Sequence, residues 1–186
     1  MCTGTADRER TAARSRGMTH KASRALQFAA LPWRIGEGGI REVMLLTTRE
    51  TRRWVIPKGW PMKGRKPAEV ASQEAYEEAG LVGQVVAKRP LGSFHYEKRL
   101  AKKAIVCEVQ VFLFRVERQL DDWPEKDQRE CQWFDAREAI ALVEEGGLAE
   151  ILDRFAGSQV RFVPQRRGRS RYAAQSGPAA LRIFPS

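Results

Sequence analysis

Short apolar, β-branched and aromatic runs recur from residue 24 onward, and they predict a chain rich in β-strands. The most strongly β-like run is 104–116, in which most residues are apolar. Gly36–Gly39 breaks the pattern and predicts a turn. Residues 94–103 are polar and basic, and we expect a connection there. The expected strands are 24–35 (interrupted at Pro32), 41–48, 54–56, 83–93, 104–116 and 132–134.

Helical spacing is clearest over 67–79, where Pro67 suits the first helical position because its missing N–H needs no acceptor. Gly80 suits the residue after the helix. Alanines at 68, 71, 75 and 79 form a small-residue stripe that lets the helix lie close to a sheet. Two more helices are expected, from 135 or 136 to 144, capped by Gly146–Gly147, and from 148 to 155. This order of elements predicts an α/β fold with a mixed sheet between helices.

One face of the helix at 67–79 carries three glutamates, Glu74, Glu77 and Glu78. Residues three and four apart share a helix face, so three carboxylates crowd one patch and repel each other unless a cation is present. Hard cations such as Mg²⁺ prefer oxygen ligands. The alternative is a solvated face, since Glu is a good helix former. The glycine- and proline-rich loop before the helix favours the first interpretation, metal-assisted chemistry on phosphates.

Gly59 through Leu81 resembles the sequence box of the Nudix hydrolase superfamily, a glycine followed at fixed spacing by glutamates and a second glycine. Gly59 matches the first glycine, the three glutamates match the three carboxylates, and Gly80 matches the last glycine. The resemblance extends over roughly residues 25–155. It implies the Nudix α/β/α sandwich, with a mixed β-sheet between helices.

Three positions depart from the box. Arg65 stands where the box has Glu, Gln73 where it has Arg, and Ala75 where a bulkier apolar residue is usual. In the family, that Glu and that Arg are taken to support each other across loop and helix. Because both are replaced, no orphan charge remains, and the carboxylates are intact. The resemblance therefore still implies catalysis, with a looser helix orientation and a lower rate.

Within the superfamily, the chain is most similar to the diphosphoinositol polyphosphate phosphohydrolase branch. Arg53–Pro57, Trp123–Pro124 and Gln132–Asp135 carry this similarity. It implies a pyrophosphohydrolase that cleaves phosphoanhydride bonds in nucleoside- or inositol-diphosphate-linked substrates, of the diphosphoinositol polyphosphate or diadenosine polyphosphate type. The three glutamates would be its catalytic groups and the ligands of Mg²⁺, with Mn²⁺ as a substitute.

Basic residues near the box are the candidates for substrate binding. Lys58, Gly59 and Arg65 lie in the loop that leads into the helix, where they are expected to contact phosphate. Lys98 and Lys102 lie in the densest basic stretch of the middle of the chain, which suits a phosphate clamp. The alternative for this stretch is a hairpin edge strand that its lysines protect from aggregation. The expected partner is a polyphosphorylated small molecule.

The net charge of +10 comes from 33 basic and 23 acidic residues, and its excess lies near the ends of the chain. Residues 1–24 hold six basic and two acidic residues, and 165–186 hold five arginines and no acid. Such tails add at most weak affinity for nucleic acid, which is not the favoured partner. We expect flexible basic tails at 1–24 and 161–186, on either side of a Nudix domain at 25–160.

Cysteine and hydropathy patterns bear on the compartment. Cys2, Cys107 and Cys131 are odd in number and lack metal-type spacing, which predicts free thiols in a reducing compartment. No apolar run is long enough for a membrane span, and no secretory signal is recognisable. A cytoplasmic protein without a membrane partner is therefore expected.

Two alternative functions stay open at this point. One is an enzyme for nucleotide sugars or for the 5′ end of RNA, which the basic tails would suit. The other is a Nudix-like domain that binds a ligand or RNA without hydrolysis, which the departures at Arg65 and Gln73 keep in play. Glu130, where some family members place an auxiliary carboxylate, is expected to be a surface residue.

Overall fold

The structure is a computed structural model that describes residues 24–100 and 103–158. The flexible tails expected at 1–24 and 161–186 and the candidate Lys102 lie outside this part of the chain, Arg24 excepted. The described elements are β1 (Arg24–Ile35), η1 (Glu37–Gly39), β2 (Arg41–Thr47), β3 (Trp54–Val55), β4 (Lys58–Gly59), α1 (Pro67–Ala79), β5 (Leu81–Val85), β6 (Gly92–Leu100), β7 (Lys103–Gln119), η2 (Lys126–Gln128), β8 (Cys131–Asp135), α2 (Ala139–Leu142) and α3 (Gly146–Gly157).

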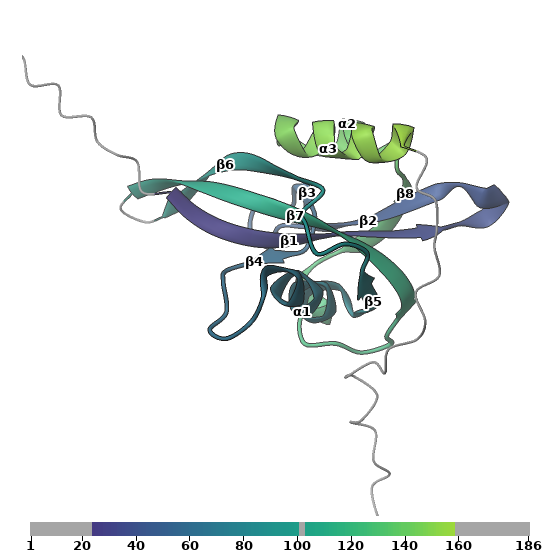
Figure 1. Cartoon of the computed structure of the whole chain (residues 1–186), viewed down its shortest axis with the longest axis horizontal. Coiled ribbons are helices and arrows are strands. Elements are labelled where there is room, and N and C mark those ends of the chain that lie inside the picture. Colours follow the sequence, from purple (N-terminus) through teal and green to yellow (C-terminus); the bar gives the residue numbers. More distant parts are fainter. Residues whose placement is uncertain (1–23, 101–102, 159–186) are drawn as a thin grey trace, which may run out of the picture.

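The strands form one mixed sheet that lies between two helical layers (Figure 1). Its path runs β3-β2-β1-β7-β5, with β4 paired to β1, β6 to β7 and β8 to β2. Strands β1 and β7 are parallel, and the other paired strands are antiparallel. Helix α1 covers one face, and α2 and α3 cover the other. The predicted α/β/α sandwich is confirmed.

Each face of the sheet has its own hydrophobic core, because successive side chains of a strand point to opposite faces. In β1, Ala29, Leu31 and Trp33 face α3, whereas Phe28 and Ala30 face α1. The α3 side is completed by four buried apolar residues of that helix: Leu148, Ile151, Leu152 and Phe155. Both faces of the central strands are therefore buried, which fixes the register that positions the loop before α1.

Helix α1 begins and ends where local sequence predicts. The backbone N–H of Lys66 donates to Glu69 Oε2 at 3.1 Å, and Pro67 follows as the first helical residue. Gly80 ends the helix with a φ of 66°, in the left-handed region that favours glycine. The buried alanines of the predicted stripe, Ala71, Ala75 and Ala79, let the helix approach the sheet closely.

The expected strand at 83–93 and the connection at 94–103 are wrong. Strand β5 ends at Val85, and β6 begins at Gly92 and pairs with β7 as a hairpin. The error came from polarity: outward residues such as His95 and Glu97 dominate the composition, while Phe94 and Tyr96 pack inward. The alternative proposed for this stretch, a lysine-bearing hairpin strand, describes its backbone correctly.

Two further expectations are corrected. Pro32 does not interrupt β1, because it lies between the segments of β1 that pair with β4 and β2, where no antiparallel partner needs its N–H. The helix expected up to residue 144 is the single turn α2, and Gly146–Gly147 begin α3 instead of capping a preceding helix. Within the described residues, no helix is both long enough and apolar enough to cross a membrane.

Candidate active site

Glu74 lies on the side of α1 that meets strand β4. Its carboxylate packs so closely against Gly59 that a Cβ added there would lie 1.8 Å from Glu74 Oε1. Burial raises the pKa of the Glu74 carboxyl to about 7, and the negative charges of Glu78 and Glu77 add to the effect. This close approach is what requires glycine at position 59. Backbone conformation does not require it, because the φ of Gly59 lies outside the left-handed region.

Glu78 is a buried carboxylate, with a side chain only 8% exposed. The backbone N–H of Lys58 donates to Glu78 Oε2 at 3.1 Å, and the guanidinium of Arg129 forms an ion pair with Oε1. Burial raises the pKa of the Glu78 carboxyl, whereas the charges of Arg129 and Lys58 act in the opposite direction. Glu78 therefore ties α1 both to β4 and to the segment before β8.

Two of the departures from the box, Arg65 and Gln73, form a hydrogen-bonded chain that ends at Glu77. Arg65 Nη1 donates to Gln73 Oε1 at 3.2 Å, and Gln73 Nε2 donates to Glu77 Oε1 at 2.5 Å. An amide accepts at one end and donates at the other, so Arg65 fixes which end faces Glu77. The replaced residues thus still join the loop to the helix, through a neutral amide.

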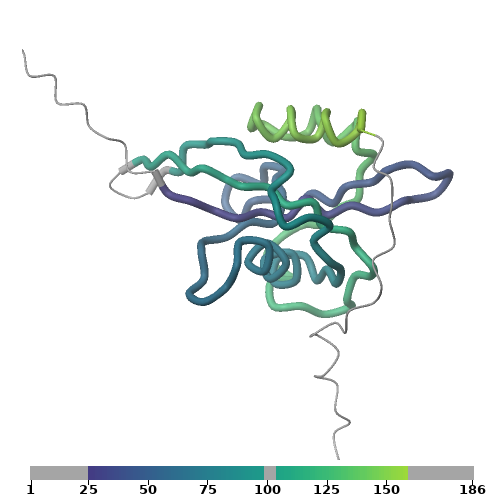
Figure 2. The backbone as a smooth tube through the Cα atoms, viewed as in Figure 1, coloured from purple at the N-terminus to yellow at the C-terminus, as the bar shows by residue number. Residues whose placement is uncertain are grey.

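Arg129 and Glu125 complete the carboxylate cluster, and neither was predicted from the sequence. Both lie between β7 and β8, in a segment that passes beside α1 (Figures 1 and 2). The backbone N–H of Glu125 donates to the carbonyl oxygen of Glu77 at 3.1 Å, and Arg129 Nε donates to Glu125 Oε2, also at 3.1 Å. The Arg129 side chain is 12% exposed, so a nearly buried cation lies among the acids.

Glu130, the auxiliary carboxylate considered above, pairs with a residue outside this cluster. It is 54% exposed and forms an ion pair with Arg52 at 3.4 Å, as expected of a surface residue. The acidic composition of the segment between β7 and β8 was the available signal. It could not identify Glu125, because an irregular segment has no periodicity that tells which side chain faces α1.

A basic–aromatic patch lies on the other side of β4, formed by Gln27, Lys58, Trp60, Tyr96 and Lys98. Because Lys58 and Gly59 are successive residues of a strand, their side-chain directions point to opposite faces. Gly59 faces Glu74, and the ammonium of Lys58 lies 5.9 Å from the centre of the Tyr96 ring. The two-residue strand therefore has Glu74 on one face and the Lys58 ammonium on the other, where Glu145 also acts on that ammonium.

The patch is partly buried at its base and open at its rim. Tyr96 Oη donates to Gln27 Oε1 at 2.7 Å, and burial lowers the pKa of the Lys58 ammonium. Trp60 is 42% exposed, and Lys98 Nζ lies 4.9 Å from the centre of its ring. A cation held over an exposed aromatic ring, beside a loop of backbone N–H groups, suits a phosphorylated ligand.

Comparison with known proteins places this geometry in a family. The family model described as the NUDIX domain matches residues 28–155, more than half of the chain. The chain belongs to the Nudix family. The family predicted from the Gly59–Leu81 box is thereby confirmed.

Individual relatives agree with this assignment. Nudix hydrolase 12, mitochondrial, of Arabidopsis thaliana is 31% identical over 121 residues, which cover 61% of this Nudix chain and 58% of that protein. Diphosphoinositol polyphosphate phosphohydrolase 2 of Rattus norvegicus is 29% identical over 106 residues, 55% of each chain. The Nudix chain thus spans less than two thirds of the length of these relatives. A C. elegans Ap4A hydrolase binary complex shares the fold, with a TM-score of 0.54, 15% identity, and coverage of 71% and 95% of the two chains.

Nudix hydrolases generally use a divalent metal, and the carboxylates of α1 are the groups that could hold one here. Within residues 24–100 and 103–158, no three His, Cys, Asp or Glu side chains are gathered as ready metal ligands. The donor set still suits a hard cation, because Glu74, Glu77 and Glu78 offer only oxygens and repel one another. The guanidinium of Arg129 supplies positive charge beside Glu78 in this arrangement. That the three glutamates bind metal stays a prediction.

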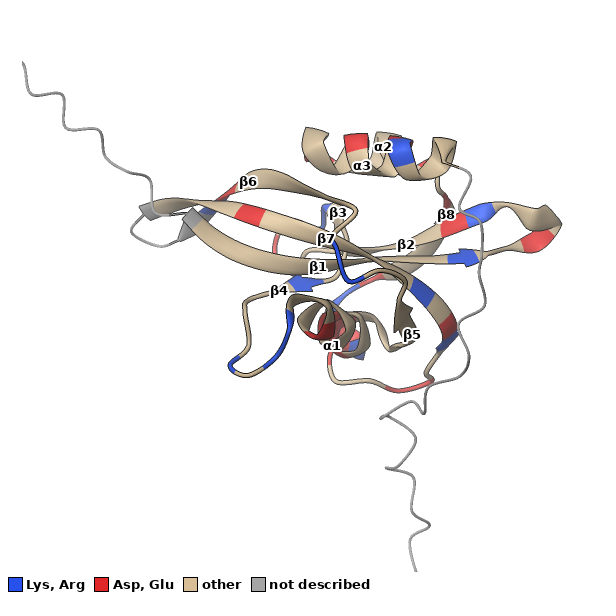
Figure 3. Ribbon diagram, viewed as in Figure 1, with Lys and Arg blue, Asp and Glu red and all other residues tan. Residues whose placement is uncertain are grey.

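The candidate substrate residues of this Nudix chain fall into three groups. Lys58, Gly59 and Lys98 lie together at β4 and the patch. Arg65 is exposed and bonded to Gln73, at the start of the chain that leads to Glu77. Lys102 lies outside the described residues. Figure 3 shows acidic positions on α1 and basic positions on the loop before it. Contacts of these residues with a substrate stay predictions.

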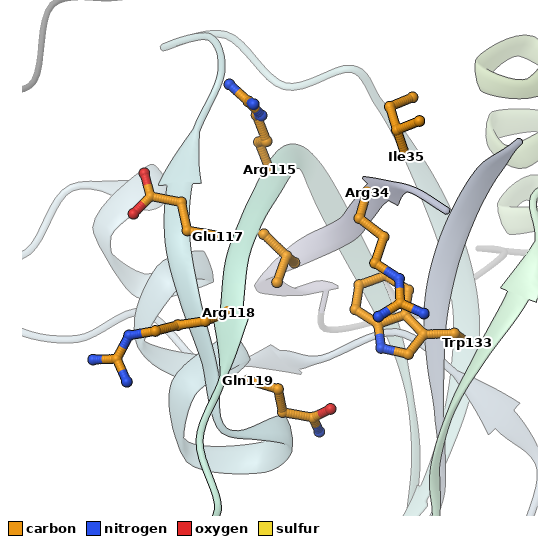
Figure 4. A pocket seen from close by; sticks show the side chains of 8 residues that line it. Arg34, Ile35, Arg115, Glu117, Arg118, Gln119 and Trp133 are labelled. Carbon is orange, nitrogen blue, oxygen red and sulfur yellow. The ribbon is translucent and has the colours of Figure 1, made fainter. Parts of the chain in front are cut away.

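A cavity of about 310 Å³ lies where β1 and β7 diverge, beyond the pair Trp33–Arg115. Arg34 lies over the ring of Trp133, 4.1 Å from its centre, whereas Arg118 points away from it (Figure 4). None of the three glutamates lines this cavity. It is separate from the candidate active site.

Proposed function

We propose that this Nudix chain is a pyrophosphohydrolase that cleaves a phosphoanhydride bond of a polyphosphorylated small molecule, with Mg²⁺, or Mn²⁺ in its place, bound by Glu74, Glu77 and Glu78. One observation carries the proposal. A strand of two residues, Lys58–Gly59, separates three crowded carboxylates from a basic–aromatic patch. A polyphosphate that crosses this strand would reach both sides at once.

The residues around the proposed metal site would have separate roles in the reaction. The metal, when bound, neutralises charge on the phosphate oxygens and activates water for attack on phosphorus. Gly59 leaves room for the carboxylate of Glu74 beside the phosphate chain. Lys98 and Lys58, on the patch side of β4, would bind the phosphate groups that are not at the scissile bond. Gln73 orients Glu77 through the hydrogen bond described above.

Substrates of the diphosphoinositol polyphosphate or diadenosine polyphosphate type suit this site. Relatives bear on both: one is named diphosphoinositol polyphosphate phosphohydrolase 2, and one structural neighbour is named Ap4A hydrolase. The exposed ring of Trp60 favours the second type, because a nucleobase stacks on an aromatic face and an inositol ring does not.

A substrate panel tests the proposal. The purified chain is incubated with inositol pyrophosphates, dinucleoside polyphosphates, nucleotide sugars and 5′-triphosphorylated RNA, with Mg²⁺, with Mn²⁺, or with a chelator. Metal-dependent phosphate or nucleotide release from one of the first two classes is expected. Preference for a nucleotide sugar or RNA would move the proposal to another substrate class. Binding of these ligands without turnover would refute the enzyme.

The Glu77→Gln variant tests the site itself. It keeps the side-chain volume and a hydrogen-bonding partner for Gln73, and it removes the negative charge. We expect turnover to fall by about two orders of magnitude or more, with an unchanged fold by circular dichroism. Near-native turnover would show that the carboxylates of α1 are not the reaction centre.

A further inference from the structure

Arg129 makes three polar contacts in the candidate site, two with carboxylates and one with a backbone carbonyl oxygen. Its guanidinium pairs with Glu78 Oε1. Its Nε donates to Glu125 Oε2 at 3.1 Å, and its Nη1 donates to the carbonyl oxygen of Thr47 at 3.3 Å. It also affects Lys58 by charge repulsion, which helps to lower the pKa of that ammonium. A buried cation at this position affects both sides of β4.

Each oxygen of Glu78 already has one partner, so fewer of its acceptor positions are free for another cation. One of its oxygens is paired with Arg129, and the other accepts the backbone N–H of Lys58 at 3.1 Å. A divalent cation that uses Glu78 as a ligand would lie in the same region as the guanidinium. Two positive groups at that distance repel strongly in a partly buried site.

We propose that Arg129 is a displaceable counter-ion, which competes with a divalent cation for Glu78 and stays anchored on Glu125 when the cation binds. The inference rests on the proposed function only for its choice of cation. It assigns to Arg129 a positioning role: the residue holds Glu78 in place and sets how tightly the carboxylates bind metal.

The surroundings of Glu125 explain why displacement does not release Arg129 altogether. Glu125 also pairs with Arg49, and hydrogen bonds from Arg49 and Arg129 hold its pKa below the usual range although burial acts in the opposite direction. Glu125 therefore stays ionised and keeps one end of the Arg129 guanidinium. Movement of Nη2 away from Glu78 would free that carboxylate while Nε stays bonded to Glu125.

Metal binding to the Arg129→Gln variant tests the competition. Mn²⁺ is titrated into the free full-length protein at pH 8, and unbound Mn²⁺ is followed by electron paramagnetic resonance. Loss of the competing charge should lower the Mn²⁺ dissociation constant by about tenfold. Arg49→Gln is the matched control, because Arg49 also pairs with Glu125 but acts on Glu78 only through longer-range charge, whereas Arg129 forms the ion pair with Glu78. Its Mn²⁺ affinity should stay within about twofold of the wild type.

A second measurement on the unaltered protein covers the case in which Arg129→Gln does not fold. The side-chain ¹⁵Nε resonance of Arg129, assigned through Arg129→Lys, is followed during a Mg²⁺ titration by NMR. The proposal requires this resonance to shift with saturation while that of Arg41, bound to the carbonyl oxygen of Phe155, does not. An unmoved Arg129 resonance at saturating Mg²⁺ overturns it.

The outcomes separate this inference from the proposed function. If Arg129→Gln binds Mn²⁺ no more tightly than the wild type, and the wild type hydrolyses a substrate with metal, the competition is refuted and the enzyme stands. If the wild type hydrolyses nothing in the panel but Arg129→Gln binds Mn²⁺ more tightly, the competition stands and the enzyme is refuted.

Discussion

Glu74 lies directly over Gly59, and no side chain larger than hydrogen fits between them. We therefore expect Gly59→Ala to displace the Glu74 carboxylate, and to lower turnover by about a hundredfold, since misplacement of a catalytic group by about 1 Å has effects of this size. Steady-state kinetics with the substrate identified in the panel measure the effect.

Gly146→Ala is the matched control for this change. A Cβ at Gly146 meets no atom within 4 Å, and the residue lies at the start of α3. Alanine there should leave turnover intact and raise the free energy of unfolding by up to about 1 kcal/mol. Equal activity losses in the two variants would show that Gly59 has no special relation to Glu74.

The chain Arg65–Gln73–Glu77 predicts a reciprocal pair of variants. Arg65→Glu alone places an acid next to Gln73 Oε1, turns the amide around and directs an oxygen at Glu77, so turnover should fall about tenfold. The double variant Arg65→Glu/Gln73→Arg creates an ion pair across the same gap and should regain most of the lost rate. A double variant slower than Arg65→Glu would rule out this coupling.

Lys98 should act on substrate binding and not on chemistry. Its ammonium lies over Trp60, away from the carboxylates, so Lys98→Ala should raise KM by about tenfold and leave kcat within about twofold. Lys126→Ala is the control, because Lys126 makes a similar contact with Trp123 at 5.6 Å outside the patch. A fall in kcat with constant KM in Lys98→Ala would contradict the assignment.

The raised pKa of Glu74 predicts how stability depends on pH. Between its ordinary pKa of 4.5 and the value of about 7 in the folded chain, the native state binds more protons at this carboxyl than the unfolded state. The free energy of unfolding must then decrease as pH rises through this window. In Glu74→Gln this contribution is absent. The Tm of the variant minus the Tm of the wild type should therefore increase from pH 5 to pH 8.

Thermal unfolding followed by circular dichroism at several pH values measures this difference. The comparison is made without added divalent metal, because a bound cation would relieve the repulsion that helps to raise this pKa. A difference in Tm between Glu74→Gln and the wild type that is constant across the range would show that the Glu74 carboxyl titrates normally in the folded chain.

The sequence was most informative where structure is set locally. Pro67 and Gly80 bound α1 because each acts through its own backbone geometry, and the alanine stripe told which face meets the sheet. Strand β6 was missed because pairing with β7, its partner in the hairpin, decides its conformation while its exposed residues suggest a loop. Composition alone does not contain that pairing.

The same distinction applies to the site. Glu74, Glu77 and Glu78 were predictable as a group because helical periodicity brings them together. Arg129 was not, since its role depends on how an irregular segment of the chain folds back onto α1. The hydrogen bond from Arg65 to Gln73 was equally hidden, because two separate departures from the box compensate each other only when their distance is known.

The short pairing of strand β4 limits how the chain between Ile56 and Gly59 tolerates changes in length. It is joined to β1 by two residue pairs, Phe28–Gly59 and Ala29–Lys58. Since direction alternates at each residue, deletion of one position upstream would present Gly59 to Tyr96 and Trp60 to the glutamates. Replacements between Ile56 and Gly59 should therefore be tolerated more readily than single-residue insertions or deletions.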